Sequence, residues 1–234
     1  MQLKLLLTGS ELMTGDTVDS NSAMIATMCL DKGIQVSYKA TVSDDLEQLI
    51  SEIERISQTA DVLIVNGGLG PTSDDLTSEA LAVVLDSPLQ FHQGALAHLN
   101  KWCAERDYEL SDANKKQALL PECVELVANS VGSAVGFKAS HNDCLIICTP
   151  GVPSELDIML KDQILPELSA RLSSDVHPKR IRFRVFGFGE SNLQQKIVAI
   201  PDNDNDDILF DFLNNLKILC YRGSKLDVLD RYYN

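Results

Sequence analysis

The sequence predicts a doubly wound α/β domain with a mostly parallel sheet, followed by a small α+β domain. Strand-like and helix-like segments alternate over about the first 170 residues, and strands separated by helices favour a parallel sheet covered on both faces. Around residues 171–178 the alternation stops, and serines and a proline indicate a linker. We therefore expect two domains, residues 1–172 and 173–234.

Short apolar runs bounded by polar or glycine-containing turns mark the strands of the first domain. Two of these runs are separated only by the turn His141-Asn142-Asp143, so we expect them to pair with each other. The expected strands cover residues 3–7, 34–40, 62–65, 137–139 and 144–148.

Capping residues and apolar periodicity mark the helices. Asp44 and Glu47 form a capping-box pattern in front of an apolar helical face, and Pro153 suits the first turn of a helix. One expected helix runs from Asn21 or Ser22 to Gly33, and others start at Asp44 and Pro153 or cover residues 77–85, 93–105 and 112–120.

Beyond the linker, Ile181, Phe183 and Val185 alternate with three arginines, which predicts a half-exposed strand. A short helix opens at Glu190, and the acidic stretch Asp202–Asp207 is expected to be a loop. These segments suggest a small α+β domain that is short enough to be incomplete.

The composition excludes several classes of function. The net charge is −14 and the pI is near 4.6, a field that repels nucleic acids and anionic membranes, so a phosphate-bearing ligand must be held by local groups. No apolar run has the roughly 18 residues of a membrane span, and no signal-peptide pattern opens the chain. We expect a cytoplasmic protein whose cysteines (29, 103, 123, 144, 148 and 220) are reduced and mostly buried.

The segment Gly67–Asp75 (GGLGPTSDD) is the most informative for function. It follows a buried strand and precedes a helix, which places it at the sheet edge where open α/β folds bind ligands. Its glycines let backbone N–H groups approach an anion. Asp74 and Asp75 repel phosphate, so they are expected either to cap the helix or to bind a divalent ion that bridges phosphate oxygens.

Three further loops are expected at strand ends, and together they would converge on one rim. Each combines glycines with hydroxyl groups or carboxylates, and each alone has a purely structural interpretation. They are Thr8–Gly15, with Asn21 close behind, Gly132–Phe137 and Thr149–Glu155.

At these loops the sequence resembles the CinA (competence/damage-inducible A) family. Five family motifs occur in the family's order between residues 8 and 155: Gly9–Leu12, Gly67–Asp75, Asn114–Ala118, Gly132–Phe137 and Pro150–Glu155. In addition, Val185–Ser191 resembles the linker into the family's small KH-like second domain.

The resemblance implies the molybdopterin-binding fold of MogA and MoaB and metal-dependent hydrolysis of a nucleotide diphosphate such as ADP-ribose. Mg²⁺, Mn²⁺ or Co²⁺ would be the cofactor, and Asp74, Asp75 and Glu155 its ligands. Glu11 joins them as a fourth catalytic carboxylate. The expected substrate-binding residues are Thr8, Gly9, Ser10, Asn21, Gly67, Gly68, Gly70, Thr72, Lys116, Ser133, Gly151 and Ser154.

Two features depart from the family pattern. Ser10 replaces a threonine, and Ser73 stands where many relatives have a longer or basic side chain. Lys116 and Lys138 are expected either to compensate for this loss or to be solvated surface lysines. Full-length relatives usually continue into a nicotinamide-nucleotide deamidase domain that follows this region, so we expect no deamidation here. We expect a homo-oligomer, with a dimer favoured, and neither membrane nor nucleic acid as partner.

Two alternative functions stay open. A protein that binds or adenylates molybdopterin would typically carry G-G-T-G, whereas Leu69 stands at the threonine position. A non-catalytic module that binds a nucleotide and regulates a partner is the second. A calcium loop at Asp202–Asp207 is not supported, because Asp207 and Leu213 occupy the positions that require glycine and glutamate.

Overall fold

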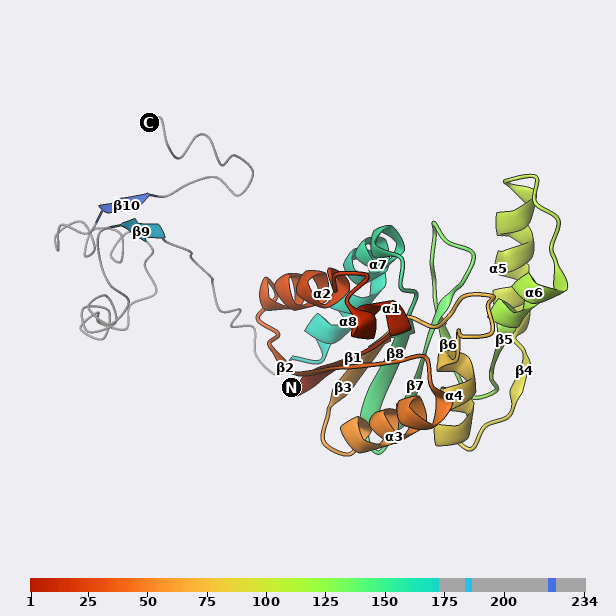
Figure 1. Cartoon of the computed structure of the whole chain (residues 1–234), viewed down its shortest axis with the longest axis horizontal. Coiled ribbons are helices and arrows are strands. Elements are labelled where there is room, and N and C mark those ends of the chain that lie inside the picture. Colours follow the sequence, from red (N-terminus) through yellow and green to blue (C-terminus); the bar gives the residue numbers. More distant parts are fainter. Residues whose placement is uncertain (173–183, 187–218, 222–234) are drawn as a thin grey trace. The chain divides into compact units, whose positions relative to one another are not determined.

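The computed structural model describes residues 1–172, 184–186 and 219–221, and the chain divides into two compact units, Met1–Pro178 and Lys179–Asn234 (Figure 1). In the second unit, β9 (Arg184–Phe186) and β10 (Leu219–Tyr221) form an antiparallel pair. The remainder of the expected KH-like domain, including its acidic loop, lies outside the described residues. Its KH-like character and the boundary at residue 172 stay predictions.

The first unit contains a six-stranded sheet with the strand order β2-β1-β3-β8-β7-β6. The strands are β1 (Leu3–Thr8), β2 (Val36–Val42), β3 (Val62–Asn66), β6 (Glu125–Val127), β7 (Gly136–His141) and β8 (Cys144–Thr149). The first four strands in this order are mutually parallel, and β7 and β6 pair antiparallel at the other end. The expected mostly parallel sheet is therefore confirmed.

Helices cover both faces of this sheet (Figure 1). The helices of the first unit are α1 (Ser10–Thr14), α2 (Asn21–Leu30), α3 (Leu46–Ser57), α4 (Thr77–Val84), α5 (Gln93–Ala104), α6 (Asp112–Lys115), α7 (Pro153–Met159) and α8 (Leu165–Ala170), and a π-helical stretch, η2 (Leu160–Ile164), joins the last two. In Figure 1, α2, α7 and α8 lie on one side of the sheet and α3 and α4 on the other.

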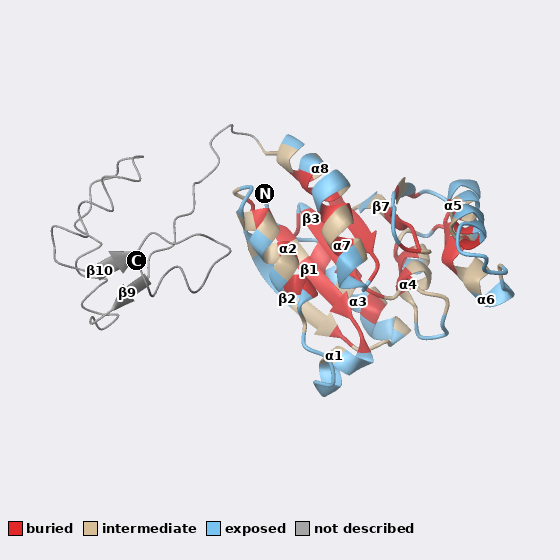
Figure 2. Ribbon diagram, turned by 90° about the horizontal axis from the view of Figure 1, so that it is seen from above, coloured by how far each residue is buried: buried red, intermediate tan, exposed pale blue. Residues whose placement is uncertain are grey.

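Side chains that alternate along each central strand build two separate cores. Leu5 and Leu7 of β1 pack in one core with Ile25 of α2 and Leu156 of α7, whereas Leu6 packs in the other core with side chains of α3 and α4. All of these residues are almost completely buried, as Figure 2 shows for the central strands. Burial on both faces explains why these strands are continuous apolar runs in the sequence.

The strand register aligns the carboxyl ends of the central strands. Leu7 of β1 pairs with Asn66 of β3, and Asn66 pairs with Thr149 of β8. The chain order reverses between β1 and β3, and this topological switch point is where open α/β sheets bind their ligands. The loops after these three strands therefore meet at one edge.

Some elements differ from the sequence-based expectation. Asp45, not Asp44, caps α3 by accepting the N–H of Gln48 at 2.9 Å. The N-cap of α2 is Ser20, whose side chain makes no capping bond, and Asp19 accepts the N–H of Ser22, so neither Asn21 nor Ser22 caps this helix. When two aspartates precede a helix, the sequence does not show which of them is the N-cap, because the backbone angles decide this.

The helix expected over residues 112–120 is too long. Helix α6 is followed by a 3₁₀ turn, η1 (Lys116–Ala118), and then by the strand β5 (Leu119–Pro121), which pairs with β4 (Leu89–Phe91). The missed strands β4, β5 and β6 have three residues each, too few for a recognisable alternation.

The described cysteines other than Cys220 are free, and four of these five are buried. Burial raises the pKa of the Cys29 thiol to about 12 and that of Cys144 to about 11, which suppresses the reactive thiolate form. Within the described part of the chain, no helix is long and apolar enough to cross a membrane.

Candidate functional site

A cleft of about 400 Å³ lies at the carboxyl ends of the central strands. All four loops expected at this rim contribute to its walls, so the predicted convergence is confirmed. The cleft is lined by Thr8, Gly9, Glu11, Asp44, Gly67, Gly68, Leu69, Gly70, Pro71, Thr72, Asp74, Asp75, Gln117, Ser133, Ala134, Pro150, Gly151, Val152 and Glu155. Its volume is in the range of small-molecule binding sites.

A network of buried polar side chains connects the ends of the strands beside the cleft. The Asn66 amide donates to Thr149 Oγ1 at 3.1 Å and to the carbonyl of Pro150 at 2.8 Å. The Asn21 amide donates to Asn66 Oδ1 at 2.9 Å and to the carbonyl of Gly151 at 2.7 Å. Because an unpaired buried amide is costly, these bonds fix the loop after β8 against the end of β3.

The loop after β3 is held in a conformation that only glycine tolerates. Gly67 has φ +110°, and a Cβ there would lie 2.7 Å from the carbonyl oxygen of Thr8. The Thr77 hydroxyl donates to the Gly67 carbonyl at 2.8 Å and pins the loop to the start of α4. Among the described residues, the N–H groups of Gly68, Leu69 and Gly70 meet no acceptor. Three successive free amides beside a cleft suit an anionic ligand.

Three of the four predicted carboxylates pack directly against glycines. A Cβ on Gly9 would lie 2.6 Å from Glu11 Oε1, one on Gly70 would lie 2.5 Å from Asp75 Oδ2, and one on Gly132 would fall within 2.0 Å of Glu155 Oε2. Each of these glycines thus leaves room for a carboxylate in its present position. A side chain there would displace the carboxylate from its position at the cleft.

Asp74 and Asp75 gather around Thr72. The Thr72 N–H donates to Asp75 Oδ2 at 2.9 Å, and its hydroxyl lies within hydrogen-bonding distance of both carboxylates. The hydrogen bond from Thr72 is the main cause that holds the pKa of Asp74 below its usual value, and the charge of Lys116 acts in the same direction. Neither aspartate caps α4, whose N-cap is Leu76 without a side-chain bond, so the capping interpretation is wrong.

Glu155 stands at the first turn of α7, half buried, and its Oε2 accepts a hydrogen bond from the Asn129 amide at 2.8 Å. Burial raises the pKa of the Glu155 carboxyl, and the bond from Asn129 only partly offsets this rise. Sequence reasoning missed Asn129, because it lies in an irregular loop 26 residues from its partner.

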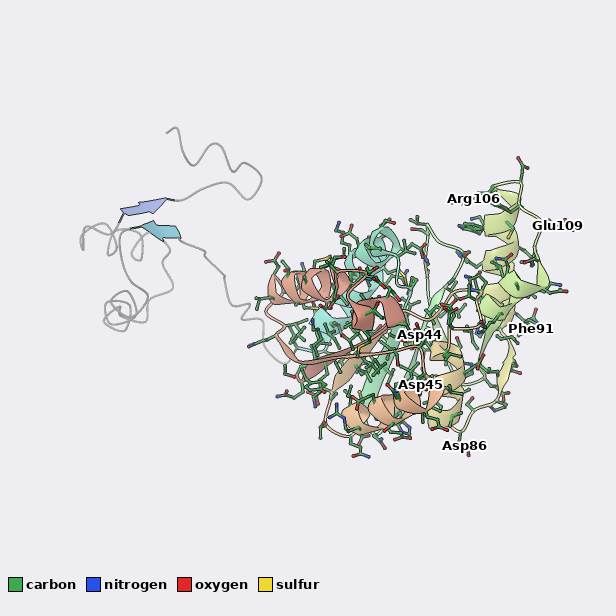
Figure 3. The ribbon with its side chains drawn as sticks, viewed as in Figure 1. Asp44, Asp45, Asp86, Phe91, Arg106 and Glu109 are labelled. Atoms are coloured by element: carbon green, nitrogen blue, oxygen red, sulfur yellow. The ribbon has the colours of Figure 1, made fainter. Side chains whose placement is uncertain are left out.

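Asp44 is a second cleft residue that sequence reasoning missed. Asp44, labelled in Figure 3, accepts the Thr8 hydroxyl at 2.9 Å and the N–H of Ser10 at 2.8 Å. These bonds connect the segment after β2 to the loop after β1. The position of Asp44 directly after a strand, like that of the predicted loops, was the signal that could have identified it.

Comparisons with known proteins identify the family. Residues 4–170 match a family described as a probable molybdopterin binding domain. The crystal structure of CinA from Thermoplasma acidophilum is 30% identical, has a TM-score of 0.65, and aligns with 70% of this chain and 96% of its own. The chain belongs to the CinA family.

The match to curated CinA relatives covers only part of their length. A CinA-like protein of Colwellia psychrerythraea is 54% identical over 196 residues, which cover 84% of this chain and 45% of the relative. The "NMN amidohydrolase-like protein YfaY" of Escherichia coli K12 is 41% identical over 84% of this chain and 49% of its own length. The chain thus spans about half the length of the curated relatives it matches. The family match confirms the predicted molybdopterin-binding type of fold.

Four residues predicted from the CinA motifs do not line the cleft. Ser10 and Asn21 support its walls through Asp44 and Asn66. Lys116 donates to the carbonyl of Thr72 at 2.8 Å and lies 3.5 Å from Glu79, so it braces the loop. Ser154 is exposed in the first turn of α7. Their direct contact with a substrate stays a prediction.

The charged side chains that line the cleft in the described part of the chain are all carboxylates: Glu11, Asp44, Asp74, Asp75 and Glu155. Among the described residues, no group of three or more His, Cys, Asp or Glu side chains is placed to hold a metal ion. A Mg²⁺-type ion needs only one or two carboxylates when substrate phosphates and water complete its coordination. The residues at the cleft therefore fit an ion that arrives with a phosphate ligand.

Proposed function

We propose that the cleft binds a nucleotide diphosphate with a divalent metal ion and hydrolyses the diphosphate bond, with ADP-ribose as the model substrate. The observation that carries this proposal is the pairing of free backbone amides with a lining whose charged side chains are all acidic. The amides of Gly68, Leu69 and Gly70 favour an anion, whereas the surrounding carboxylates repel one unless a cation lies between them. A metal–diphosphate complex satisfies both.

The side chains have separable roles in this proposal. Asp74 and Asp75 would hold the metal ion, which supplies charge neutralisation and a lowered pKa for a bound water. Glu155, whose pKa is raised and whose position Asn129 fixes, is suited to take a proton from the attacking water near neutral pH. The free amides of the loop after β3 would hold the charge that develops on the phosphate oxygens.

The molybdopterin alternative is less well supported. Leu69 occupies the position of the expected threonine, and its side chain is buried in the core, 6% exposed. It therefore offers no hydroxyl group to a pterin ligand. The amidohydrolase-like name belongs to a relative of which the matched region covers 49%, and we assign no deamidase role to the cleft.

A screen of nucleotide diphosphates with Mg²⁺, Mn²⁺ and Co²⁺, scored for release of nucleoside monophosphate, tests the proposal. We expect ADP-ribose to yield AMP and ribose 5-phosphate only when metal is present. Tight binding of the nucleotide without turnover in any metal would favour the regulatory module instead. Undiminished turnover after exhaustive EDTA treatment would contradict the metal requirement.

A further inference from the structure

Gln117 is a buried cleft residue with an unused hydrogen-bonding group. It lies in the 3₁₀ turn between α6 and β5, is 8% exposed, and lines the cleft. Its Nε2 donates to the Ser133 hydroxyl at 3.1 Å, which ties this turn to the loop before β7. Its Oε1 is buried and has no hydrogen-bond partner among the described residues. A buried carbonyl oxygen without a partner is costly, so it marks a place where a ligand can gain affinity.

The chemistry of this oxygen restricts which ligand group it accepts. An amide oxygen is only an acceptor, and the oxygens of an ionised diphosphate are acceptors as well. A hydrogen-bonding partner must therefore carry an O–H or N–H group, and the only other group in the proposed complex that an amide oxygen can bind is the metal ion. In a nucleotide diphosphate, such donors belong to the ribose hydroxyls and to the nucleobase.

A small cavity of about 20 Å³ adjoins Gln117 behind the glycine loop. Leu69, Leu89 and Leu119 form the apolar part of its wall, and Asp75, Glu79 and Lys116 form a charged part. That volume holds about one water molecule, so a nucleoside would occupy the main cleft and only reach toward this apolar wall. A few polar groups set among apolar ones are typical of subsites for the organic part of a ligand.

We infer that Gln117, held in place by Ser133, binds the nucleoside part of the nucleotide whose diphosphate lies against the glycine loop. This inference rests on the proposed function and adds an orientation to it. The nucleoside lies toward the 3₁₀ turn, and the metal–diphosphate complex lies toward Asp74 and the free amides. Gln117 thereby distinguishes a nucleotide from a bare diphosphate.

Two non-hydrolysable ligands that differ only by the nucleoside test this inference: α,β-methylene-ADP and methylenediphosphonate, each titrated calorimetrically with Mg²⁺. In Gln117→Met, which keeps the side-chain length, we expect the Kd for α,β-methylene-ADP to rise about tenfold and the Kd for methylenediphosphonate to stay unchanged. Gln90→Met, at an exposed position on β4, is the matched control and should alter neither Kd.

Ser133→Ala provides a second variant if Gln117→Met does not fold. This substitution leaves Oε1 of Gln117 intact but removes the hydroxyl group that holds the side chain in place. We expect a smaller loss of affinity, roughly threefold, again only for the nucleotide. The inference would be overturned if both variants bound the two ligands with the wild-type Kd values, or if the Kd values for both ligands rose by the same factor. Either result would leave the proposed function in place. Failure of the wild-type protein to bind either ligand would instead overturn the proposed function.

Discussion

The Asn129 amide donates one hydrogen bond to Glu155 Oε2 and another to the carbonyl of Ala134, both at 2.8 Å. Its Oδ1 accepts the N–H groups of Val131 at 3.1 Å and Gly132 at 2.9 Å. One buried side chain, 1% exposed, therefore fixes a carboxylate of the cleft and the loop that packs against it. Asn129 therefore couples the conformation of this loop to the position of Glu155.

Replacement of Asn129 by leucine should destabilise the protein. The substitution leaves the buried Gly132 amide and Ala134 carbonyl, and the amide of the exposed Val131, without their partners. We expect a loss of about 3 kcal/mol in the free energy of unfolding. Urea denaturation measures this change. Asn100→Leu on α5 removes an exposed hydrogen bond and should change stability by less than about 0.5 kcal/mol. Equal effects of the two substitutions would contradict the anchoring role.

Gly132→Ala should impair turnover far more than stability. The new methyl group would occupy the place of the Glu155 carboxylate, whose flexible end can rotate away at a cost within about 1 kcal/mol. Displacement of a reacting group lowers the rate, so we expect kcat to fall roughly tenfold or more. Steady-state kinetics and thermal melting check this. A fully active variant would show that Glu155 takes no part in the reaction.

Glu155→Gln should stabilise the metal-free protein at neutral pH. The fold raises the pKa of Glu155, so the native state favours the protonated carboxyl group. The resulting contribution to the free energy of unfolding is present below the ordinary glutamate pKa and is lost as pH rises through the folded pKa. Glutamine keeps an acceptor for Asn129 and carries no charge. The melting temperature of the variant should exceed that of the wild type at pH 7, and the difference should shrink toward pH 4. A constant difference across this range would contradict the raised pKa.

The central architecture was predictable because its signals are local. The strands 3–7, 62–65 and 144–148 are apolar runs buried on both faces, and the glycine loop follows one of them directly. The positions of the site loops then followed from the rule that ligands bind at the carboxyl ends of parallel strands.

The contacts within the site were not predictable from local patterns. Asn129 meets Glu155, and Gln117 meets Ser133, only after the chain has folded, and their sequence neighbours give no periodic signal. The alternative that Asp74 caps the helix failed for a related reason. Thr72 competes for the aspartate side chains, and the helix begins one residue after Leu76 without them.

Asp74→Asn and Asp75→Asn should each abolish turnover in a folded protein. Asparagine keeps an acceptor for Thr72, so the loop should stay intact, whereas the charge that would hold a metal ion is removed. We expect melting temperatures close to that of the wild type and rates lower by orders of magnitude. The exposed Asp86→Asn, outside the cleft (Figure 3), serves as the control. Two active single variants would move the metal site to Glu11 and Glu155.

The binding of α,β-methylene-ADP to the wild-type protein, measured by calorimetry with Mg²⁺ and again with excess EDTA, tests the central claim most directly. The lining of the cleft predicts that the ligand binds when Mg²⁺ is present. Without Mg²⁺ the affinity should fall by a factor on the order of a hundred or more, because the carboxylates then face the diphosphate with no cation between them. Equal affinity under the two conditions would contradict the account.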